Sequence, residues 1–312
     1  MQIQELISGV LAGERRVVAR AISLVEDGDP GLEGLSAGIY AATGRAATIG
    51  LTGAPGVGKS TLAGEVVRVA RAQDLRVAVL AVDPTSPYTG GALLGDRVRM
   101  QEHATDPDVF IRSMATRGHL GGMALAAPEA VRILDAAGYA RVVVETVGVG
   151  QAEVDVAAAT DTAVVVLAPG LGDAVQMAKA GILEIADVFV VNKADRDGVG
   201  EVVRELRQML RMGAARGWDP PVLATTALQH AGVDELWAAI EAHRDHLRSS
   251  GALEDKRRAR LLREVEALAA ERFRVKAAAT LAQEPALAAD LAARRLDPYA
   301  AAAMLVREAG AT

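Results

Sequence analysis

The sequence predicts an α/β protein with a doubly wound, mostly parallel sheet and helical extensions at both ends. From Ala46 to about residue 245, short runs of β-branched and apolar residues alternate with helical stretches, the order expected of an α/β fold. Hydrophobicity within these runs is continuous rather than alternating, which is typical of strands covered on both faces. Before and after this region, apolar residues recur at helical spacing.

The first 44 residues are predicted to be helical. Their apolar residues at helical spacing are Ile3, Leu6, Ile7, Val10, Leu11, Val18, Ala21, Ile22 and Val25. A turn-forming run, Asp27-Gly28-Asp29-Pro30-Gly31, breaks the helical pattern. We assign residues 1–44 to an N-terminal helical extension.

Residues 45–245 are predicted to form the central domain. The expected strands are Ala47–Leu51, Val77–Val82, Val109–Ile111, Arg141–Glu145, Thr162–Leu167, Val188–Val191 and Val222–Ala224. A domain of this length buries enough apolar surface to fold without disulfides or structural metals.

Residues 246–312 are predicted to form a C-terminal helical extension. After Ser249 the chain becomes rich in alanine, leucine, arginine and glutamate, and Pro285 and Pro298 interrupt the helical pattern. Leu261, Val265 and Leu268 lie on one helical face. This stripe needs a cover, which either the α/β body or a second copy of the chain would provide.

Composition excludes several classes of protein. The 312 residues include no cysteine, which rules out disulfides, thiolate metal sites and cysteine nucleophiles. A net charge of −6 gives no indication of a nucleic-acid or anionic membrane partner. The N-terminus lacks the pattern of a secretory signal, and no apolar stretch approaches the ~20 residues that span a bilayer. We therefore expect a cytoplasmic protein.

A glycine-rich segment follows the first expected strand and precedes a helical stretch. It matches the pattern G-x-x-x-x-G-K-S/T, in which backbone amides and a helix N-terminus hold phosphate groups. The residues predicted to bind these phosphates are Gly53, Ala54, Pro55, Gly56, Val57, Gly58, Lys59, Ser60 and Thr61. Lys59 would contact the β and γ oxygens, and the Ser60 hydroxyl would bind Mg²⁺. The alternative is a glycine-rich turn without a ligand.

Asn192-Lys193-Ala194-Asp195 directly follows the expected strand Val188–Val191. Ligands of open α/β sheets bind at the carboxyl ends of strands. A carboxylate at Asp195 can accept hydrogen bonds from guanine N1–H and the 2-amino group, whereas adenine offers neither donor. The segment predicted to donate a backbone N–H to guanine O6 is Thr226, Ala227 and Leu228. GTP and GDP are therefore the expected ligands.

Three acidic residues are candidates for a magnesium site beside Ser60. Asp83 follows the expected strand Val77–Val82, Glu145 ends the expected strand Arg141–Glu145, and Asp96 lies in a glycine-rich stretch. Carboxylate oxygens bind Mg²⁺ directly or through water. Strand-end caps and solvated loop residues are the alternatives for these positions.

Two further stretches could respond to the γ-phosphate. In Glu145–Gln151, an E-x-x-G pattern places Gly148 where its N–H can meet the γ-phosphate, and Gln151 either orients water or is an ordinary surface glutamine. Pro169–Lys179 contains glycines that permit switching between ordered and disordered states. His119 is more simply read as structural than as catalytic.

Several strings together resemble the methylmalonyl-CoA-mutase-associated GTPases, the MeaB/ArgK group. They are Asp83-Pro84-Thr85-Ser86-Pro87, Thr89-Gly90-Gly91, Leu94-Gly95-Asp96-Arg97, Ser113-Met114-Ala115-Thr116-Arg117-Gly118, Glu145-Thr146-Val147-Gly148-Val149-Gly150-Gln151 and Asn192-Lys193-Ala194-Asp195. The resemblance spans nearly the whole chain. It implies a homodimeric GTPase that acts as a chaperone of an adenosylcobalamin-dependent acyl-CoA mutase, gating cofactor loading and protecting the mutase from inactivation.

The resemblance also implies roles for single residues. The loops that carry Asp83 and Asp96 would form a first switch, Glu145–Gln151 a second and Gly170–Lys179 a third that signals to the mutase. The signalling residues would be Gln176 and Lys179, and the dimer contacts would lie after residue 246. The residues expected to act in catalysis are Lys59, Glu145, Gln151 and Lys179. Leu171–Val175 departs from the family pattern, which is more acidic there, and this leaves the partner open.

Three functions remain to be separated. Hydrolysis of GTP coupled to a partner enzyme fits the motifs best. A small-molecule kinase would need an acceptor pocket and a lid carrying arginine, and the sequence indicates neither. A binding module that holds nucleotide without hydrolysing it is the third possibility.

Overall fold

The computed structural model describes residues 2–83, 101–103, 105–115, 123–146, 152–170, 182–212 and 217–310. The chain divides into two compact units, Met1–Arg260 and Leu261–Thr312. The first unit contains the sheet, and the second contains helices.

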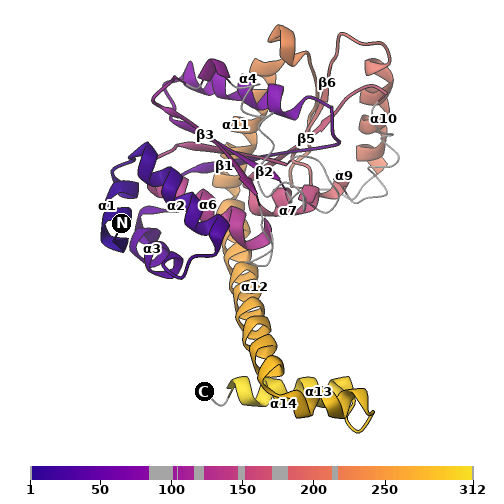
Figure 1. Cartoon of the computed structure of the whole chain (residues 1–312). Helices are drawn as coiled ribbons and strands as arrows, with labels where there is room; N and C mark the ends of the chain where they lie inside the picture. Colours follow the sequence, from indigo (N-terminus) through magenta and orange to yellow (C-terminus); the bar gives the residue numbers. More distant parts are fainter. Residues whose placement is uncertain are drawn as a thin grey trace. The chain divides into compact units, whose positions relative to one another are not determined.

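A seven-stranded sheet, described strand by strand, forms the centre of the first unit (Figure 1). The strands are β1 (Ala47–Thr52), β2 (Val77–Asp83), β3 (Val109–Ala115), β4 (Arg141–Thr146), β5 (Thr162–Leu167), β6 (Val188–Asn192) and β7 (Val222–Thr225). Their order is β3-β2-β4-β1-β5-β6-β7, and each neighbouring pair is parallel. The predicted α/β fold class is confirmed.

Helices cover both faces of this sheet (Figure 1). The helices of the first unit are α1 (Ile3–Leu11), α2 (Arg15–Asp27), α3 (Leu32–Ile39), α4 (Lys59–Arg71), α6 (Met123–Ala136), α7 (Ala152–Ala159), α9 (Ile182–Ile185), α10 (Val199–Met212) and α11 (Val233–Ser250). Short 3₁₀ turns add η1 (Tyr40–Ala42), η2 (Gln101–His103) and η3 (Ala227–Gln229).

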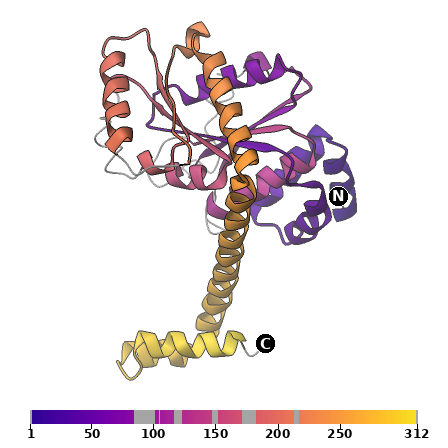
Figure 2. The same ribbon diagram turned by 180° about the vertical axis from the view of Figure 1, so that it is seen from behind.

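Alternate residues of each strand point to opposite faces, and both faces are buried. On one face, Leu80 of β2 and Val144 of β4 pack against the N-terminal helices and α6. On the other, Val79 and Val143 from the same two strands belong to the cluster with α4 and α11. The ribbon of these helices can be followed from behind in Figure 2. This two-sided burial explains why the strands read as continuous apolar runs.

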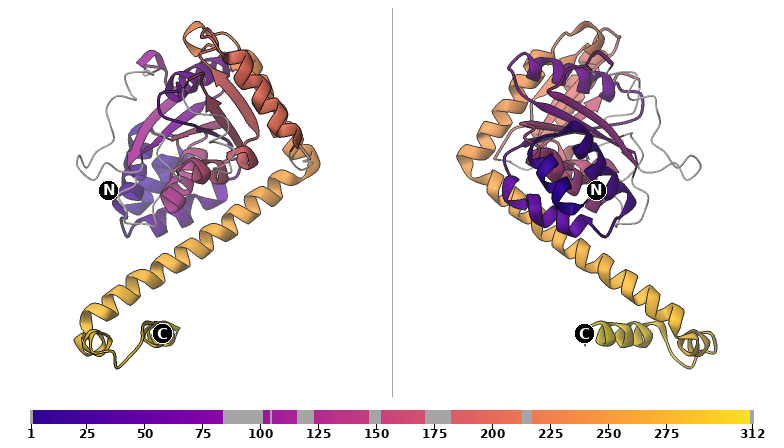
Figure 3. Two further views of the ribbon diagram at one scale, coloured as in Figure 1. Left: turned by 90° about the vertical axis from the view of Figure 1, so that its right-hand side faces the viewer. Right: turned by 60° about the vertical axis from the view of Figure 1, so that its left-hand side comes forward.

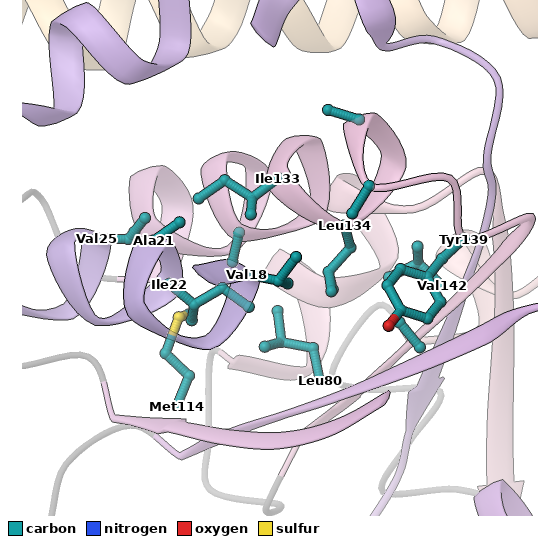
Figure 4. Close-up of a cluster of buried hydrophobic side chains, with 14 of the residues drawn as sticks. Val18, Ala21, Ile22, Val25, Leu80, Met114, Ile133, Leu134, Tyr139 and Val142 are labelled. Atoms are coloured by element: carbon teal, nitrogen blue, oxygen red, sulfur yellow. The ribbon is translucent and has the colours of Figure 1, made fainter. Parts of the chain in front are cut away.

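The N-terminal helices share a hydrophobic core with the sheet. Val18 and Ile22 of α2 are fully buried beside Leu80 of β2, Met114 of β3 and Ile133 of α6 (Figure 4). The helices of residues 3–39 lie together against one face of the sheet (Figure 3). Residues 1–44 therefore pack as part of the first unit.

The amino ends of the strands are bound to the start of a long helix, α12 (Ala252–Gln283). Asp161, which precedes β5 and is 4% exposed, accepts hydrogen bonds from Arg257 Nη2 at 2.6 Å and from Arg260 Nη2 at 2.8 Å. Burial alone would raise the pKa of this carboxyl, but the hydrogen bond from Arg257 and the charges of both arginines outweigh it and lower the pKa to about 2. The first turns of α12 are thus fixed to the sheet by a buried ion pair.

The second unit consists of the remainder of α12 with α13 (Pro285–Ala292) and α14 (Pro298–Gly310). Pro285 and Pro298 are the first residues of their helices, where proline costs no hydrogen bond. Several large apolar side chains of this unit are exposed. None of the described helices is both long enough and apolar enough to cross a bilayer.

Candidate nucleotide site

The predicted phosphate loop joins the end of β1 to the start of α4. Gly53 has a φ of +140°, and a Cβ atom there would lie 2.1 Å from the carbonyl oxygen of Val166 on β5. Only glycine fits this position. The loop therefore begins pressed against the neighbouring strand and ends at the N-terminus of α4, where backbone amides and the helix dipole favour an anion.

Lys59 is the first residue of α4, and its side chain folds over the loop. The residue is 6% exposed, and Nζ donates hydrogen bonds to the carbonyl oxygens of Gly53 at 2.6 Å and Ala54 at 3.0 Å. The buried ammonium group thus lies on the segment that the sequence predicts to hold phosphates. A cation fixed there offsets the charge of a bound di- or triphosphate.

Ser60 and Glu145 meet at the carboxyl edge of the sheet. Ser60 Oγ donates a hydrogen bond of 2.6 Å to Glu145 Oε1, and both residues are buried. Glu145 comes from β4, where it pairs in register with Leu51 of β1. A hydroxyl and a carboxylate are oxygen ligands of the kind that Mg²⁺ prefers, so this pair fits the predicted metal.

Ligands of Mg²⁺ beyond Ser60 and Glu145 would come from water, from the nucleotide or from residues outside the described ranges. The described residues contain no group of three or more histidine, cysteine or carboxylate side chains that could hold a metal ion. Asp83 is the last residue of β2 and lies at the same edge of the sheet as Glu145. Glu145 pairs with Ala81 of β2, two residues before Asp83. Only the backbone of Asp83 is described. The predicted residues that lie outside the described residues are Asp96, Gly148, Gln151, Gln176 and Lys179.

Asn192, the last residue of β6, connects three parts of the site. Its Nδ2 donates to the carbonyl oxygen of Val57 at 2.9 Å. Its Oδ1 accepts from Thr225 Oγ1 at 3.1 Å and from the Ala227 N–H at 3.2 Å. A Cβ atom on Gly58 would lie 2.4 Å from Nδ2, so the loop is too close to this amide for a residue with a side chain. One buried side chain thus ties the phosphate loop to the segment after β7.

Lys193 and Asp195 are less buried than Asn192. Lys193 has a φ of +59°, and its Nζ donates to the carbonyl oxygen of Gly56 at 2.6 Å, a second link to the phosphate loop. Asp195 follows two residues later and is exposed to solvent.

The predicted base loop, Thr226–Leu228, follows β7 as the turn η3. The Thr226 N–H donates to the Ala231 carbonyl at 3.0 Å, and the Ala231 N–H returns the bond at 3.3 Å. Ala227 is buried, whereas Leu228 is 85% exposed. The structure therefore brings this loop to the same edge as Asn192, as the motif predicts.

Two contacts of the site were missed by sequence reasoning. Thr225 Oγ1 holds Asn192, and a threonine at a strand end beside a predicted base loop could have indicated it. His230 Nδ1 lies 2.7 Å from Glu65 Oε2 on α4. Nothing in the local sequence indicates that pairing, because the two residues are 165 positions apart.

The family can be decided from comparison with known proteins. A family model described as "Methylmalonyl Co-A mutase-associated GTPase MeaB" matches residues 18–282. The chain belongs to the MeaB family. The resemblance predicted from the motifs is thereby confirmed, and the protein is a GTPase.

Relatives of this MeaB-family GTPase match it over most of their length. A protein of Pyrococcus abyssi is 47% identical over 312 residues, covering 98% of this chain and 96% of the relative. GTPase ArgK of Escherichia coli is 39% identical over 264 residues, covering 82% and 80%. A crystal structure of a LAO/AO transport system kinase has a TM-score of 0.71 at 27% identity and covers 99% of this chain and 97% of its own.

Proposed function

We propose that this MeaB-family GTPase binds Mg²⁺ and GTP at the carboxyl edge of its sheet and selects guanine through Asp195. The contacts of Asn192 carry the proposal, because they join the phosphate loop and the base loop at one edge of the sheet. The exposed carboxylate of Asp195 would accept from guanine N1–H and the 2-amino group. Adenine would leave this carboxylate without a donor.

The phosphate loop and the end of β4 carry the groups to which we assign hydrolysis. Lys59 would place its ammonium group against the β and γ oxygens, where it stabilises charge that grows in the transition state. Ser60 and Glu145 would hold Mg²⁺ together with Asp83 and Asp96. When bound, the metal would neutralise phosphate charge and orient the triphosphate. Gly148 would donate its N–H to the γ-phosphate, and Gln151 would orient the attacking water.

Calorimetry and turnover test this proposal together. The protein should bind GTP with Mg²⁺ at least tenfold more tightly than ATP, and inorganic phosphate should accumulate with GDP. No heat with GTP, or equal heat with ATP, would sink the proposal. Phosphate that passes to a small molecule instead of water would identify a kinase, and GTP that stays intact for hours with a partner present would identify a binding module.

We further propose that the GTPase acts as a chaperone of an adenosylcobalamin-dependent acyl-CoA mutase. The family description, which associates these GTPases with methylmalonyl-CoA mutase, supports this role. Gln176 and Lys179 are the residues proposed to signal to the mutase. Each candidate mutase should be mixed with the protein and GTP turnover measured. Stimulation by one mutase, lost in Gln176→Ala while basal turnover stays, is the expected result, and equal stimulation in Gln176→Ala would remove the signalling role of that residue.

The second unit is proposed to form a homodimer. Leu261, Val265, Leu268 and Val275 follow one another on α12 at spacings of 4, 3 and 7 residues and are each at least 40% exposed. Such a heptad stripe is buried when two helices pair. Sedimentation should therefore show a dimer for the wild type and a monomer for Val265→Glu, whereas Arg263→Glu, on the same helix but outside the stripe, should remain dimeric. A monomeric wild type would exclude the dimer.

A further inference from the structure

The loop that follows β7 is short and tightly closed. Residues 226–231 are joined at their ends by the paired hydrogen bonds of Thr226 and Ala231. Gly232, with a φ of +74°, leads the chain away, and a Cβ there would lie 2.3 Å from the carbonyl oxygen of Ala224. The position of this closed loop relative to the rest of the site is set by its contacts with other elements.

His230 extends from this loop to the helix that follows the phosphate loop. The residue has a φ of +58°, and Nδ1 lies 2.7 Å from Glu65 Oε2 on α4. With a proton on Nδ1, the imidazole donates to the carboxylate in its neutral or its charged form. The Glu65 side chain is 11% exposed and also accepts from Arg68 Nε at 2.8 Å. The carboxylate that contacts His230 is therefore also bonded to a residue of its own helix.

Hydrogen bonds hold the loop to two different elements, in addition to the packing of Ala227 in the cluster with α4. On its inner side, Ala227 N–H donates to Asn192 at the end of β6. On its outer side, His230 contacts Glu65 of α4, the helix that begins with Lys59 and Ser60. The second contact fixes the distance between the base loop and the phosphate-binding end of α4.

We infer that His230 is a positioning residue for guanine recognition, which it serves by pairing with Glu65 and holding the base loop against the phosphate-loop helix. The inference rests on the proposed binding of guanine at this loop. His230 itself need not touch the nucleotide. Without the pair, the loop must be ordered again each time a base binds, and that ordering lowers affinity.

The size of the effect follows from the exposure of the pair. The His230 side chain is 59% exposed, whereas that of Glu65 is 11% exposed. Their hydrogen bond is therefore weaker than a fully buried one and stronger than a pair in open solvent. Loss of the pair should weaken GDP binding roughly three- to tenfold. Binding of inorganic tripolyphosphate should change less than about twofold, because it uses the phosphate loop and not the base loop.

The test compares His230→Asn with the wild type. Asparagine tolerates a positive φ but is too short to reach Glu65. We expect weaker GDP binding by calorimetry, a KM for GTP raised by the same factor, a kcat within about twofold of the wild type and unchanged tripolyphosphate binding. Glu65→Ala should reproduce the GDP effect, and the double variant should be no weaker than either single one, since both remove one interaction. Arg68→Met, which removes only the other partner of Glu65, is the matched control and should bind GDP like the wild type.

The outcomes separate this inference from the proposed function. A wild type that fails to prefer GDP over ADP would overturn the proposed function itself. A wild type with that preference, together with unchanged GDP binding in both His230→Asn and Glu65→Ala, would overturn only the inference. Equal loss of GDP and tripolyphosphate binding, or an equal loss in Arg68→Met, would also overturn it, because the effect would then be a general disturbance of α4.

Discussion

Asn192 Nδ2 donates a hydrogen bond of 2.9 Å to the carbonyl oxygen of Val57, so the last residue of β6 is bonded directly to the phosphate loop. In the same side chain, Oδ1 accepts from Thr225 and Ala227. Each of these three hydrogen bonds joins elements that are distant in the sequence. The segments proposed to bind the phosphates and the base are therefore linked through one residue.

Asn192→Ala should weaken both nucleotide binding and folding. The substitution leaves buried donors and acceptors on Val57, Thr225 and Ala227 without a partner, which costs about 1–3 kcal/mol in the free energy of unfolding. The Kd for GDP should rise on the order of tenfold or more. Calorimetry and urea denaturation measure the two effects. Thr225→Val removes one of the three bonds and should show a smaller change, and an equal or larger change would contradict the assignment of Asn192 as the central link.

Asp195→Asn should abolish the preference for guanine. The amide can accept one hydrogen bond from the base but has lost its charge and its second acceptor, and two charge-assisted bonds are worth about 3 kcal/mol or roughly a hundredfold. Competition between GTP and ATP for a fluorescent GDP analogue measures the ratio. Asp197→Asn, an exposed neighbour on the same segment, should keep the wild-type ratio. If Asp195→Asn also keeps it, Asp195 does not read the base.

Glu145→Gln should raise the magnesium requirement of GTP hydrolysis. Glutamine can still accept the hydrogen bond from Ser60, so the fold is retained while the anionic oxygen is lost. The Mg²⁺ concentration at half-maximal turnover should increase on the order of tenfold. Titration of Mg²⁺ at saturating GTP measures this shift, with Glu201→Gln on α10 as a control. A wild-type titration curve in Glu145→Gln would exclude this carboxylate from the metal site.

The ion pairs of Asp161 should make stability depend on acidic pH. The folded pKa of about 2 lies below the ordinary aspartate pKa of 3.8, so the stabilisation is present in full above pH 3.8 and is lost as the pH falls through 2. The difference corresponds to roughly 2 kcal/mol, about half of which should be lost by pH 3. Urea denaturation at pH 7 and pH 3 should therefore show a smaller loss in Asp161→Asn than in the wild type.

The control for this pH dependence lies on α12, the helix that carries Arg257 and Arg260. Asp255 pairs with Arg258, and both side chains are largely exposed. Asp255→Asn should show the wild-type loss of stability between pH 7 and pH 3, because exposed pairs contribute little. If Asp161→Asn and the wild type lose equal stability over this range, Asp161 does not titrate as its contacts indicate.

The sequence predicted those features that leave a local pattern. Strands such as Thr162–Leu167 are apolar at every position because both faces are buried, and the phosphate loop requires glycine at positions such as Gly53. Contacts between distant residues leave no such pattern. Asp161 and Arg257 are 96 positions apart and Glu65 and His230 are 165 apart, and each of these residues alone resembles an ordinary surface charge.

The ion pairs between α12 and Asp161, just before β5, limit how far the chain can be shortened from its C-terminal end. A chain shortened at residue 245 or 250 would keep every strand and every nucleotide motif. It would nevertheless lose Arg257 and Arg260, and breaking the buried ion pairs of Asp161 by removing these partners should lower stability. The smallest fragment that folds as the GTPase should therefore extend through Arg260, well past the last strand.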